Sequence, residues 1–343
     1  MAENGKLTVA VTGPTGSIGT SFIRELDREP SVGRVLGMAR RPFDPGKLGL
    51  RKLEYVRGDI RDRSAVESLV AEADVVVHLA FILFEPSEKS RATNLVGARN
   101  VFEVTLESTA KRLIYTSSVA AYGWHENNPQ PLTEDVPARG TETHYYSKQK
   151  AEVERLLTNL ARHSDKEVYV FRPCIVAGPN AIDLIERIPL VKTGMRVPRT
   201  IRKVTAALPL LRPVLPDPGL EFQVVHEDDV ADALRRATLG MGRPGIYNLS
   251  ADGALTVADL ARALGWYSIP LPSIAIDATA AIVSRLPLMP AEAKWVDSMK
   301  LPVIMDSSKA KKELGWSPTH DAAETLAQTI FAARAQGVLG SAS

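Results

Sequence analysis

A glycine-punctuated stretch at residues 9–19 constrains the fold of this chain more than any other feature; it reads VAVTGPTGSIG. An apolar, strand-like run over residues 7–11 leads into it, and helix-forming residues follow over 17–26. In this spacing Gly13 permits a tight turn, Gly16 lets a phosphate group approach the backbone, and Gly19 lets the helix pack against the strand. The unpaired N–H groups at the helix start would then hold an anion. An ordinary strand–turn–helix is the alternative that the spacing alone leaves open.

Strand-like and helix-like segments alternate through the first half of the chain. Strand patterns cover residues 34–39, 53–56, 74–80, 112–116 and 167–171, and helical patterns cover 62–72, 89–108 and 146–161. Asp62 is a suitable N-cap for the first of these helices. The candidate buried helix positions are Val66, Leu69, Val70, Leu95, Val96, Val101, Phe102 and Leu106. This alternation predicts an α/β fold, a Rossmann-type doubly wound parallel sheet.

The regular alternation ends after Pro173, and this change predicts a second, smaller lobe. Residues 180–220 and 251–330 are rich in proline and aliphatic side chains. We expect residues 1–179 to form a dinucleotide-binding domain, with residues 221–250 returning to it. The segments 180–220 and 251–330 would form a substrate-binding lobe across the carboxyl ends of the strands, where such sheets bind ligands.

Composition excludes several other classes of protein. The chain is 45% hydrophobic and 24% charged, as in a soluble globular enzyme, and its formal charge of +2 argues against nucleic acid as a partner. A single cysteine, Cys174, excludes an intramolecular disulfide. The first residues lack the apolar core of a secretory signal, and the longest apolar runs, 75–84 and 269–290, are too short or are interrupted by charges and prolines. We therefore expect no membrane association and a cytoplasmic location.

Three side chains suggest a catalytic site. Ser118 follows a strand pattern, and Tyr146 and Lys150 are four residues apart on one helix, so they share a helical face. A lysine ammonium and a nearby nicotinamide cation would favour the phenolate of Tyr146, which suits it to proton transfer. The alternative is a solvated helix face on which Lys150 pairs with Glu154. Tyr145 competes for the tyrosine role, but the residue four positions after it is Gln149.

The chain resembles the extended short-chain dehydrogenase/reductase family, which includes nucleotide-sugar epimerases and dehydratases and 3β-hydroxysteroid-type dehydrogenases. The motifs that carry this resemblance run in the family's order along nearly the whole chain: TGxxGxxG (12–19), GDI (58–60), HLA (78–80), NLVG (94–97), YTSSVAAYG (115–123), YxxxK (146–150), RPxxVxGP (172–179), VHEDDVA (225–231) and LGWxP (314–318).

The resemblance implies roles for individual residues. Ser118, Tyr146 and Lys150 would be the catalytic set, and Asn94 would support the active-site helices or simply pack between them. The cofactor would be bound by Gly13, Thr15, Gly16, Ser17, Ile18, Gly19, Arg40, Arg41, Asp59, Ile60, Leu79, Ala80, Thr116, Tyr146, Lys150 and Pro173. His226 and Asp229 match a structural turn of the family, and we expect no metal site. We interpret His78, His144 and Cys174 as packing residues. Family members often form homodimers by pairing two long helices, here 89–108 and 146–161.

The residues after the second strand pattern indicate which dinucleotide is bound. NAD sites usually place an acid about twenty residues beyond the glycines, whereas this chain has Ala39, Arg40 and Arg41 there. No carboxylate would repel a 2′-phosphate, and the guanidiniums would clamp it. We therefore predict NADP, with NAD possible if the two arginines are only surface charges.

The substrate class is less constrained. Residues 119–121 are Val-Ala-Ala, where the family's 4,6-dehydratases carry an acid pair, and no arginine stands in the segment 220–225, where many epimerases bind a diphosphate. Arg196, Arg199, Arg202 or Arg212 would be a substitute. The lobe is apolar at 206–211, Val214, Leu215, Trp266, Tyr267, Ile269, Leu271 and 274–288, and residues 81–84 are apolar as well; these residues form either a pocket for a partly apolar small molecule or the core of the lobe.

Three functions fit these patterns. The first is an NAD(P)-dependent oxidoreductase acting on an alcohol or carbonyl group. The second is a nucleotide-sugar epimerase resembling UDP-glucose 4-epimerase, with tightly bound NAD and no net redox change. The third is a non-catalytic NADP-binding module, which the intact Ser118, Tyr146 and Lys150 disfavour.

Overall fold

The computed structural model describes residues 5–83, 88–186, 188, 191, 212–270 and 302–339. The chain divides into two compact units. The first comprises Met1–Cys174, Asp228–Leu249 and Met305–Ser317, and the second comprises Ile175–Glu227, Ser250–Ile304 and Pro318–Ser343.

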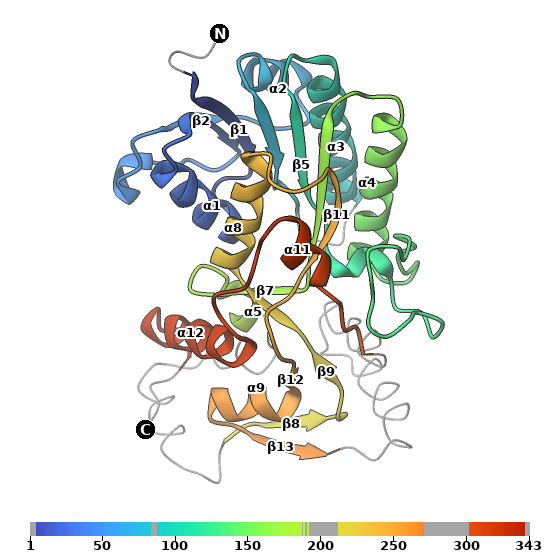
Figure 1. The fold of residues 1–343 in the computed structure, drawn as a ribbon. Coiled ribbons are helices and arrows are strands. Elements are labelled where there is room, and N and C mark those ends of the chain that lie inside the picture. Colours follow the sequence, from blue (N-terminus) through green and yellow to red (C-terminus); the bar gives the residue numbers. More distant parts are fainter. Residues whose placement is uncertain are drawn as a thin grey trace. The chain divides into compact units, whose positions relative to one another are not determined.

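A seven-stranded parallel sheet forms the centre of the first unit (Figure 1). Its order is β11-β6-β5-β4-β1-β2-β3. The strands are β1 (Leu7–Thr12), β2 (Val32–Ala39), β3 (Leu53–Arg57), β4 (Val75–His78), β5 (Arg112–Thr116), β6 (Glu167–Pro173) and β11 (Gly245–Leu249). The strand order reverses direction between β1 and β4, so the carboxyl ends of these two strands flank the position where doubly wound sheets bind ligands. The predicted Rossmann-type sheet is therefore confirmed.

Helices cover both faces of this sheet (Figure 1). One layer holds α2 (Arg63–Val70), α3 (Glu88–Glu107) and α4 (Tyr145–Ala161), and the other holds α1 (Ser17–Arg28) and α8 (Glu227–Thr238). An ion pair of 3.0 Å between Arg235 and Glu29 joins α8 to α1. The Asp62 side chain accepts from the backbone N–H groups of Ser64 and Ala65, which confirms the predicted cap of α2.

The burial of the helices follows the expected periodicity with one error. Val66, Leu69 and Val70 of α2 and Val101 and Phe102 of α3 are buried in the main hydrophobic cluster. Leu95 and Leu106 are partly buried against the same cluster, but Val96 is 46% exposed, so its predicted burial is wrong. The inner face of α3 runs through Asn94, Ala98, Val101 and Thr105. Val96, two residues from Asn94 and from Ala98, points away from that face.

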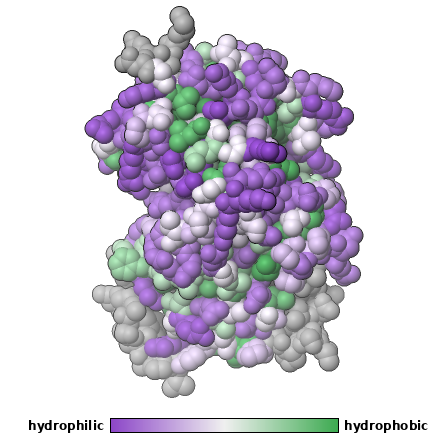
Figure 2. All heavy atoms as spheres, viewed as in Figure 1, coloured by the Kyte–Doolittle hydropathy of each residue, from purple (hydrophilic) through white to green (hydrophobic). Residues whose placement is uncertain are grey.

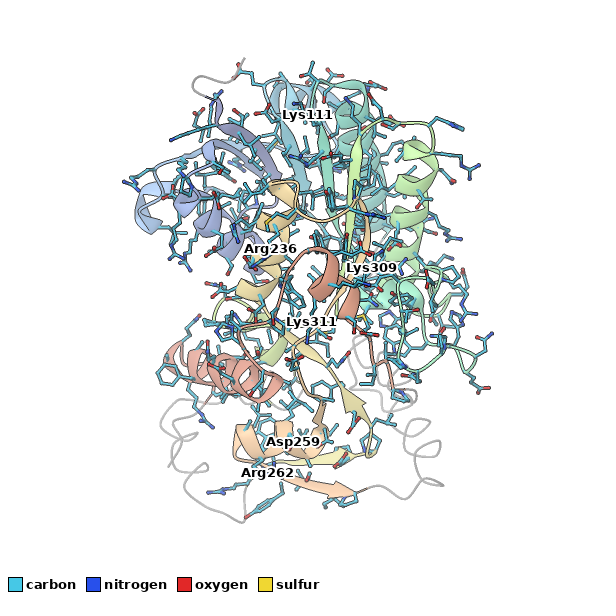
Figure 3. All side chains as sticks on the ribbon, in the orientation of Figure 1. Lys111, Arg236, Asp259, Arg262, Lys309 and Lys311 are labelled. Carbon is cyan, nitrogen blue, oxygen red and sulfur yellow. The ribbon has the colours of Figure 1, made fainter. Side chains whose placement is uncertain are left out.

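A short C-terminal segment completes the first unit. Helix α11 (Ser308–Glu313) packs against β11, and Lys309 Nζ donates to the carbonyl oxygen of Ile246 at 2.9 Å while lying 4.9 Å from the centroid of the Tyr247 ring (Figure 3). Trp316 is fully buried, and its indole N–H donates to the carbonyl oxygen of Asp229 at 2.8 Å. This bond gives the predicted LGWxP motif a structural role.

Short strands in pairs build the second unit. β7 (Ile175–Ala177) pairs with β10 (Val224–His226), β8 (Val214–Asp217) with β13 (Tyr267–Pro270), and β9 (Glu221–Phe222) with β12 (Leu255–Thr256). The helices described here are α5 (Asp183–Glu186), α9 (Val257–Leu264) and α12 (Ala322–Ala335), and their apolar faces share one hydrophobic cluster. Helix α9 begins with a capping box between Thr256 and Asp259, and Asp259 also pairs with Arg262 at 2.7 Å (Figure 3).

The observed division differs from the predicted boundaries: the first unit ends at Cys174 instead of residue 179, and at Leu249 instead of residue 250. Residues 221–227 belong to the second unit, because β10 pairs with β7 and β9 pairs with β12 instead of joining the large sheet. Residues 305–317 belong to the first unit, because α11 packs on β11.

Only some of the apolar residues that the sequence assigns to the lobe are among the described residues. Residues 206–211, Leu271 and 274–288, together with Arg196, Arg199, Arg202 and Phe84, lie outside the described residues. Leu215 and Trp266 pack against the core of the second unit, whereas Val214, Tyr267 and Ile269 are 42%, 48% and 56% exposed. The face in Figure 2 is largely hydrophilic, with separate small hydrophobic patches. No helix among the described residues combines the length and hydropathy that crossing a membrane requires.

Candidate functional site

The glycine turn has the geometry of a phosphate-binding loop. Gly13 has φ = +77°, and a Cβ there would lie 2.8 Å from the backbone nitrogen of Ala80. A Cβ on Gly19 would lie 2.3 Å from the carbonyl oxygen of Gly13, so only glycine lets α1 approach the turn this closely. A Cβ on Gly16 would meet only the Gly13 oxygen, at 3.6 Å.

The start of α1 is prepared for an anion. Ser17 is its first residue, Ile18 and Gly19 complete the start of the first turn, and Thr15 precedes the N-cap Gly16, which provides no side-chain cap. The amide groups of this turn therefore keep their capacity to donate, and the helix dipole adds positive potential. These residues fit the pyrophosphate of a dinucleotide.

The end of β4 lies against this turn. Leu79 and Ala80 follow β4, and their backbone contacts Gly13, as expected of neighbours across the reversal of strand order. The next residue but one, Ile82, is clamped by Asn94: its N–H donates to Asn94 Oδ1 at 2.8 Å, and its carbonyl accepts from Asn94 Nδ2 at 3.1 Å. Asn94 Nδ2 also donates to Gln149 Oε1 at 2.8 Å. Asn94 therefore joins α3, α4 and the segment after β4.

Ser118 and Tyr146 come together from different elements. Ser118 follows β5 and is the N-cap of a short 3₁₀ turn (Val119–Tyr122), where its Oγ accepts from the N–H of Ala120 at 3.2 Å. The His144 ring is the side-chain cap of α4 and accepts from the N–H of Ser147, which sets the start of the helix that carries Tyr146. The Ser118 side chain lies near enough to the Tyr146 phenol to lower its pKa.

Burial controls the charge of Tyr146. It raises the pKa of the phenol to about 12, against the opposing effect of the Ser118 side chain. The expected stabilisation of the phenolate by Lys150 together with a nicotinamide cation stays a prediction; in the protein by itself burial favours the neutral phenol, and Lys150 Nζ lies 5.9 Å from its ring centroid. At neutral pH the Tyr146 phenol is therefore protonated.

Lys150 lies in a buried aromatic environment. Its Nζ donates to the carbonyl oxygen of Thr116 at 2.9 Å, and burial lowers the pKa of the ammonium to about 7 while Glu154 opposes the shift. The hydroxyl of Thr116 is buried and has no hydrogen-bond partner among the described residues, which leaves a polar atom for a ligand.

The proposed pairing of Lys150 with Glu154 on a solvated helix face is excluded. Both side chains are buried, and the Glu154 carboxylate accepts from Arg172 Nε at 3.1 and 3.2 Å and from Ser117 Oγ at 2.8 Å. The Arg172 guanidinium also lies 4.3 Å from the centroid of the Tyr122 ring. Sequence reasoning noted Arg172 only as part of a motif and missed this ion pair, which joins residues 18 positions apart.

Two further groups of predicted residues lie at the ends of other strands. Arg40 and Arg41 follow β2 and are exposed, and the Asp59 carboxylate after β3 pairs with Arg61 at 2.7 Å, which lowers its pKa. Ile60 is buried in the main cluster. Sequence reasoning missed Arg57, whose Nε donates to the carbonyl oxygen of Arg40 at 3.0 Å.

The remaining predicted residues have structural surroundings. Pro173 ends β6, and Cys174 is buried directly after it. His78 is buried, its Nδ1 lies 2.7 Å from Thr12 Oγ1, and burial lowers its pKa to about 3. His226 stacks on His320 with ring centroids 4.0 Å apart. Within the described residues no cluster of three or more His, Cys, Asp or Glu side chains is able to hold a metal ion.

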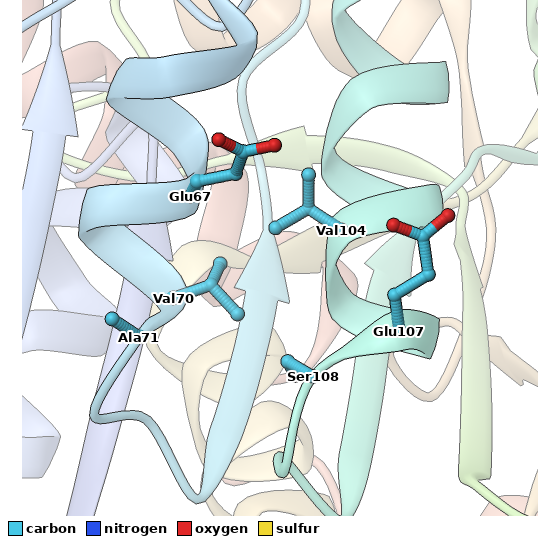
Figure 4. Close-up of a pocket in the computed structure, with 6 residues that line it drawn as sticks. All are labelled: Glu67, Val70, Ala71, Val104, Glu107 and Ser108. Carbon is cyan, nitrogen blue, oxygen red and sulfur yellow. The ribbon is translucent and has the colours of Figure 1, made fainter.

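A concavity of about 230 Å³ between α2 and α3 does not belong to this site (Figure 4). It is lined by Glu67, Val70, Ala71, Val104, Glu107 and Ser108. These residues lie near the C-terminal ends of both helices, which in a parallel α/β sheet are at the amino edge of the strands. The glycine turn and Ser118 are at the carboxyl edge.

The fold and this carboxyl-edge arrangement define a Rossmann-type α/β protein. The model of the NAD dependent epimerase/dehydratase family matches residues 9–250, which is more than half of the chain, and the chain belongs to that family.

Individual relatives are more distant. The chain is 26% identical over 320 residues to the uncharacterised protein Rv0501 of Mycobacterium tuberculosis, covering 90% of this chain and 80% of the relative. It is 29% identical over 368 residues to dTDP-glucose 4,6-dehydratase of Streptomyces antibioticus, covering 94% and 91%. Among solved structures, UDP-glucose 4-epimerase of Thermotoga maritima aligns with a TM-score of 0.69 at 21% identity, covering 96% of this chain and 99% of that chain. This last similarity concerns the fold.

Proposed function

We propose that this protein is an NAD(P)-dependent oxidoreductase that transfers hydride between nicotinamide and an alcohol or carbonyl carbon of a partly apolar small molecule. The proposal rests on three side chains that lie at the same carboxyl edge of the sheet as the glycine turn: Ser118, Tyr146 and Lys150. The ring of Phe81, whose centroid lies 5.7 Å from that of Tyr146, favours an apolar portion in the substrate.

The roles of the residues follow from their charge states. Tyr146, protonated at neutral pH, gives its proton to the substrate oxygen in the reducing direction and takes it back in the oxidising direction. Ser118 binds the same oxygen, and Lys150 binds ribose hydroxyls of the dinucleotide. When bound, the dinucleotide supplies or accepts the hydride.

The first test removes the proton donor. In Tyr146→Phe we expect kcat for the reduction of ketones and aldehydes to fall by about 10²- to 10⁴-fold, since one general acid is lost. The dissociation constant of the dinucleotide should stay close to that of the wild type. Turnover that survives in Tyr146→Phe contradicts the assignment, and Tyr145→Phe is the matched control.

NADP is our proposed cofactor, with NAD as the alternative. Arg40 and Arg41 are exposed at the end of β2, and the Arg57 side chain binds the Arg40 carbonyl, so three arginine residues lie near this strand end. We expect Arg40→Ala and Arg41→Ala to raise Kd for NADPH about 10- to 100-fold, through the loss of charge-assisted hydrogen bonds, with little change for NADH. Arg51→Ala removes another exposed arginine as the control. Equal wild-type affinities for NADPH and NADH would refute the preference.

A nucleotide-sugar epimerase with tightly bound NAD is the second candidate, favoured by family membership. It predicts conversion of a UDP-sugar without added cofactor and without net NADPH consumption. Elimination by a 4,6-dehydratase is disfavoured, because Val119, Ala120 and Ala121 supply no acid after Ser118. A non-catalytic NADP-binding module would bind NADPH with no turnover that Tyr146→Phe alters. We further propose a cytoplasmic homodimer.

A further inference from the structure

The ammonium of Lys150 is surrounded by three aromatic rings. Its Nζ lies 3.9 Å from the centroid of the Phe81 ring, 5.2 Å from that of Tyr115 and 5.9 Å from that of Tyr146. We call Phe81, Tyr115 and Tyr146 the aromatic cage. Phe81 makes the closest of these contacts, and its ring also meets the Tyr146 ring edge-on at 5.7 Å. One phenylalanine therefore touches both members of the Tyr–Lys pair.

The backbone fixes where the Phe81 ring lies. On one side, Ala80 is pressed against Gly13 of the glycine turn. On the other side, both backbone polar groups of Ile82 bind the Asn94 amide. Phe81 is thus held between two anchored neighbours, so its contact with Lys150 is not that of a freely rotating surface side chain.

The other groups around Lys150 supply little compensation for its burial. The Thr116 carbonyl accepts one N–H, and His78, with a pKa of about 3, is neutral. Burial raises the pKa of both Tyr115 and Tyr146, so these phenols are uncharged at neutral pH. Glu154 is the anion that favours the ammonium, and its carboxylate is already bound by Arg172.

We propose that Phe81 is a positioning residue that keeps Lys150 a cation by presenting the negative face of its ring to the ammonium. An ammonium that is removed from water gains more from a ring face than an exposed one does. In the proposed function Lys150 binds ribose as a cation, so this inference rests on the proposed function for its consequence, although not for its physical test. Phe81 itself touches no reacting atom.

The test titrates Lys150 directly. In protein labelled with ¹³C at the lysine ε-carbon, Lys150→Arg assigns the resonance, and the pH dependence of its shift reports the pKa without substrate. Phenylalanine at position 81 is replaced by its mono-, di- and trifluorinated forms, which keep the shape and progressively weaken the ring's negative face. We expect the Lys150 pKa to fall stepwise, by about one unit in total.

Natural substitutions separate ring electronics from packing. Phe81→Tyr should keep the Lys150 pKa close to the wild-type value, whereas Phe81→Leu should lower it by about one unit. Phe43→Leu, which changes a half-buried ring that packs on Tyr55, is the control and should leave it unchanged. The proposal is overturned if the Lys150 pKa does not change with fluorination of Phe81. It is also overturned if Phe81→Tyr and Phe81→Leu change this pKa equally.

Turnover measurements on the same variants separate the proposal about Phe81 from the proposed function. If the carbonyl reductase assignment holds, the alkaline limb of turnover should move to lower pH in the same order as the Lys150 pKa, because the cation is lost earlier as pH rises. If no carbonyl or alcohol is turned over but the Lys150 pKa still falls as the ring at position 81 is fluorinated, the proposed function fails while the inference about Phe81 stands.

Discussion

At the scale of single residues, burial decides charge more than the nearest opposite charge does. Burial disfavours the phenolate and the ammonium alike. It therefore raises the pKa of Tyr146 to about 12 and lowers the pKa of Lys150 to about 7. Both shifts favour the uncharged forms, so Glu154 and the aromatic cage are the groups that help to retain the charge on Lys150.

His78 is the residue for which this rule has a measurable consequence for stability. Its pKa is about 3 in the folded protein and about 6.5 in an unfolded chain, so below pH 6.5 the unfolded state binds a proton that the folded state excludes. The free energy of unfolding should therefore be highest above pH 6.5. It should fall by about 1.4 kcal/mol per unit from this residue as pH decreases toward 3.

Denaturant titrations at several pH values measure this slope. His78→Gln keeps an acceptor for Thr12 and should reduce the dependence of the free energy of unfolding on pH between 3 and 6.5. His163→Gln changes an exposed histidine and should leave this dependence unchanged. An unchanged slope in His78→Gln would mean that His78 is already protonated in the folded protein or has its ordinary pKa there.

At the scale of elements, the strand–turn–helix at the amino end shows how one loop serves both folding and binding. Gly19 has no space for a Cβ, whereas Gly16 has space within the protein. The packing of the folded protein therefore explains why glycine stands at positions 13 and 19. It does not require glycine at position 16, where we expect a bound ligand to need the space.

Substituting the two glycines separates these roles. Gly16→Ala should change the free energy of unfolding by less than about 1 kcal/mol, because only a cap preference is altered, yet raise the dinucleotide Kd tenfold or more. Gly19→Ala should lower stability by about 1–3 kcal/mol and impair binding, because its Cβ overlaps the Gly13 oxygen. Calorimetry of unfolding and of NADPH binding measures both effects. Wild-type NADPH affinity in Gly16→Ala would remove the turn from the cofactor site.

At the scale of the whole molecule, α3 and α4 are the helices that we propose to pair in a homodimer. They pack side by side in the first unit, and α3 exposes Val96. Val96 therefore lies on a solvent-facing part of α3, where a pairing helix would contact it.

Light scattering with size-exclusion chromatography tests this pairing. We expect the wild type to have twice the chain mass of 37.3 kDa and Val96→Arg to be a monomer, because a buried guanidinium without a partner is costly. Val56→Arg changes a valine that is 59% exposed on β3 and should remain a dimer. A wild type that is monomeric at micromolar concentration contradicts the proposal.

The sequence by itself determined the elements and their alternation, because strand and helix patterns, Asp62 as a cap and the glycine spacing are local properties of the chain. It also placed Ser118 after a strand, and Tyr146 and Lys150 on one helical face. Only the tertiary structure decided the charges of these groups, the clamp of Asn94 on Ile82 and the ring of Phe81 against Lys150. It likewise joined Glu154 to Arg172. These features depend on burial and on contacts between residues distant in the chain, and no local pattern encodes how much water a side chain loses on folding.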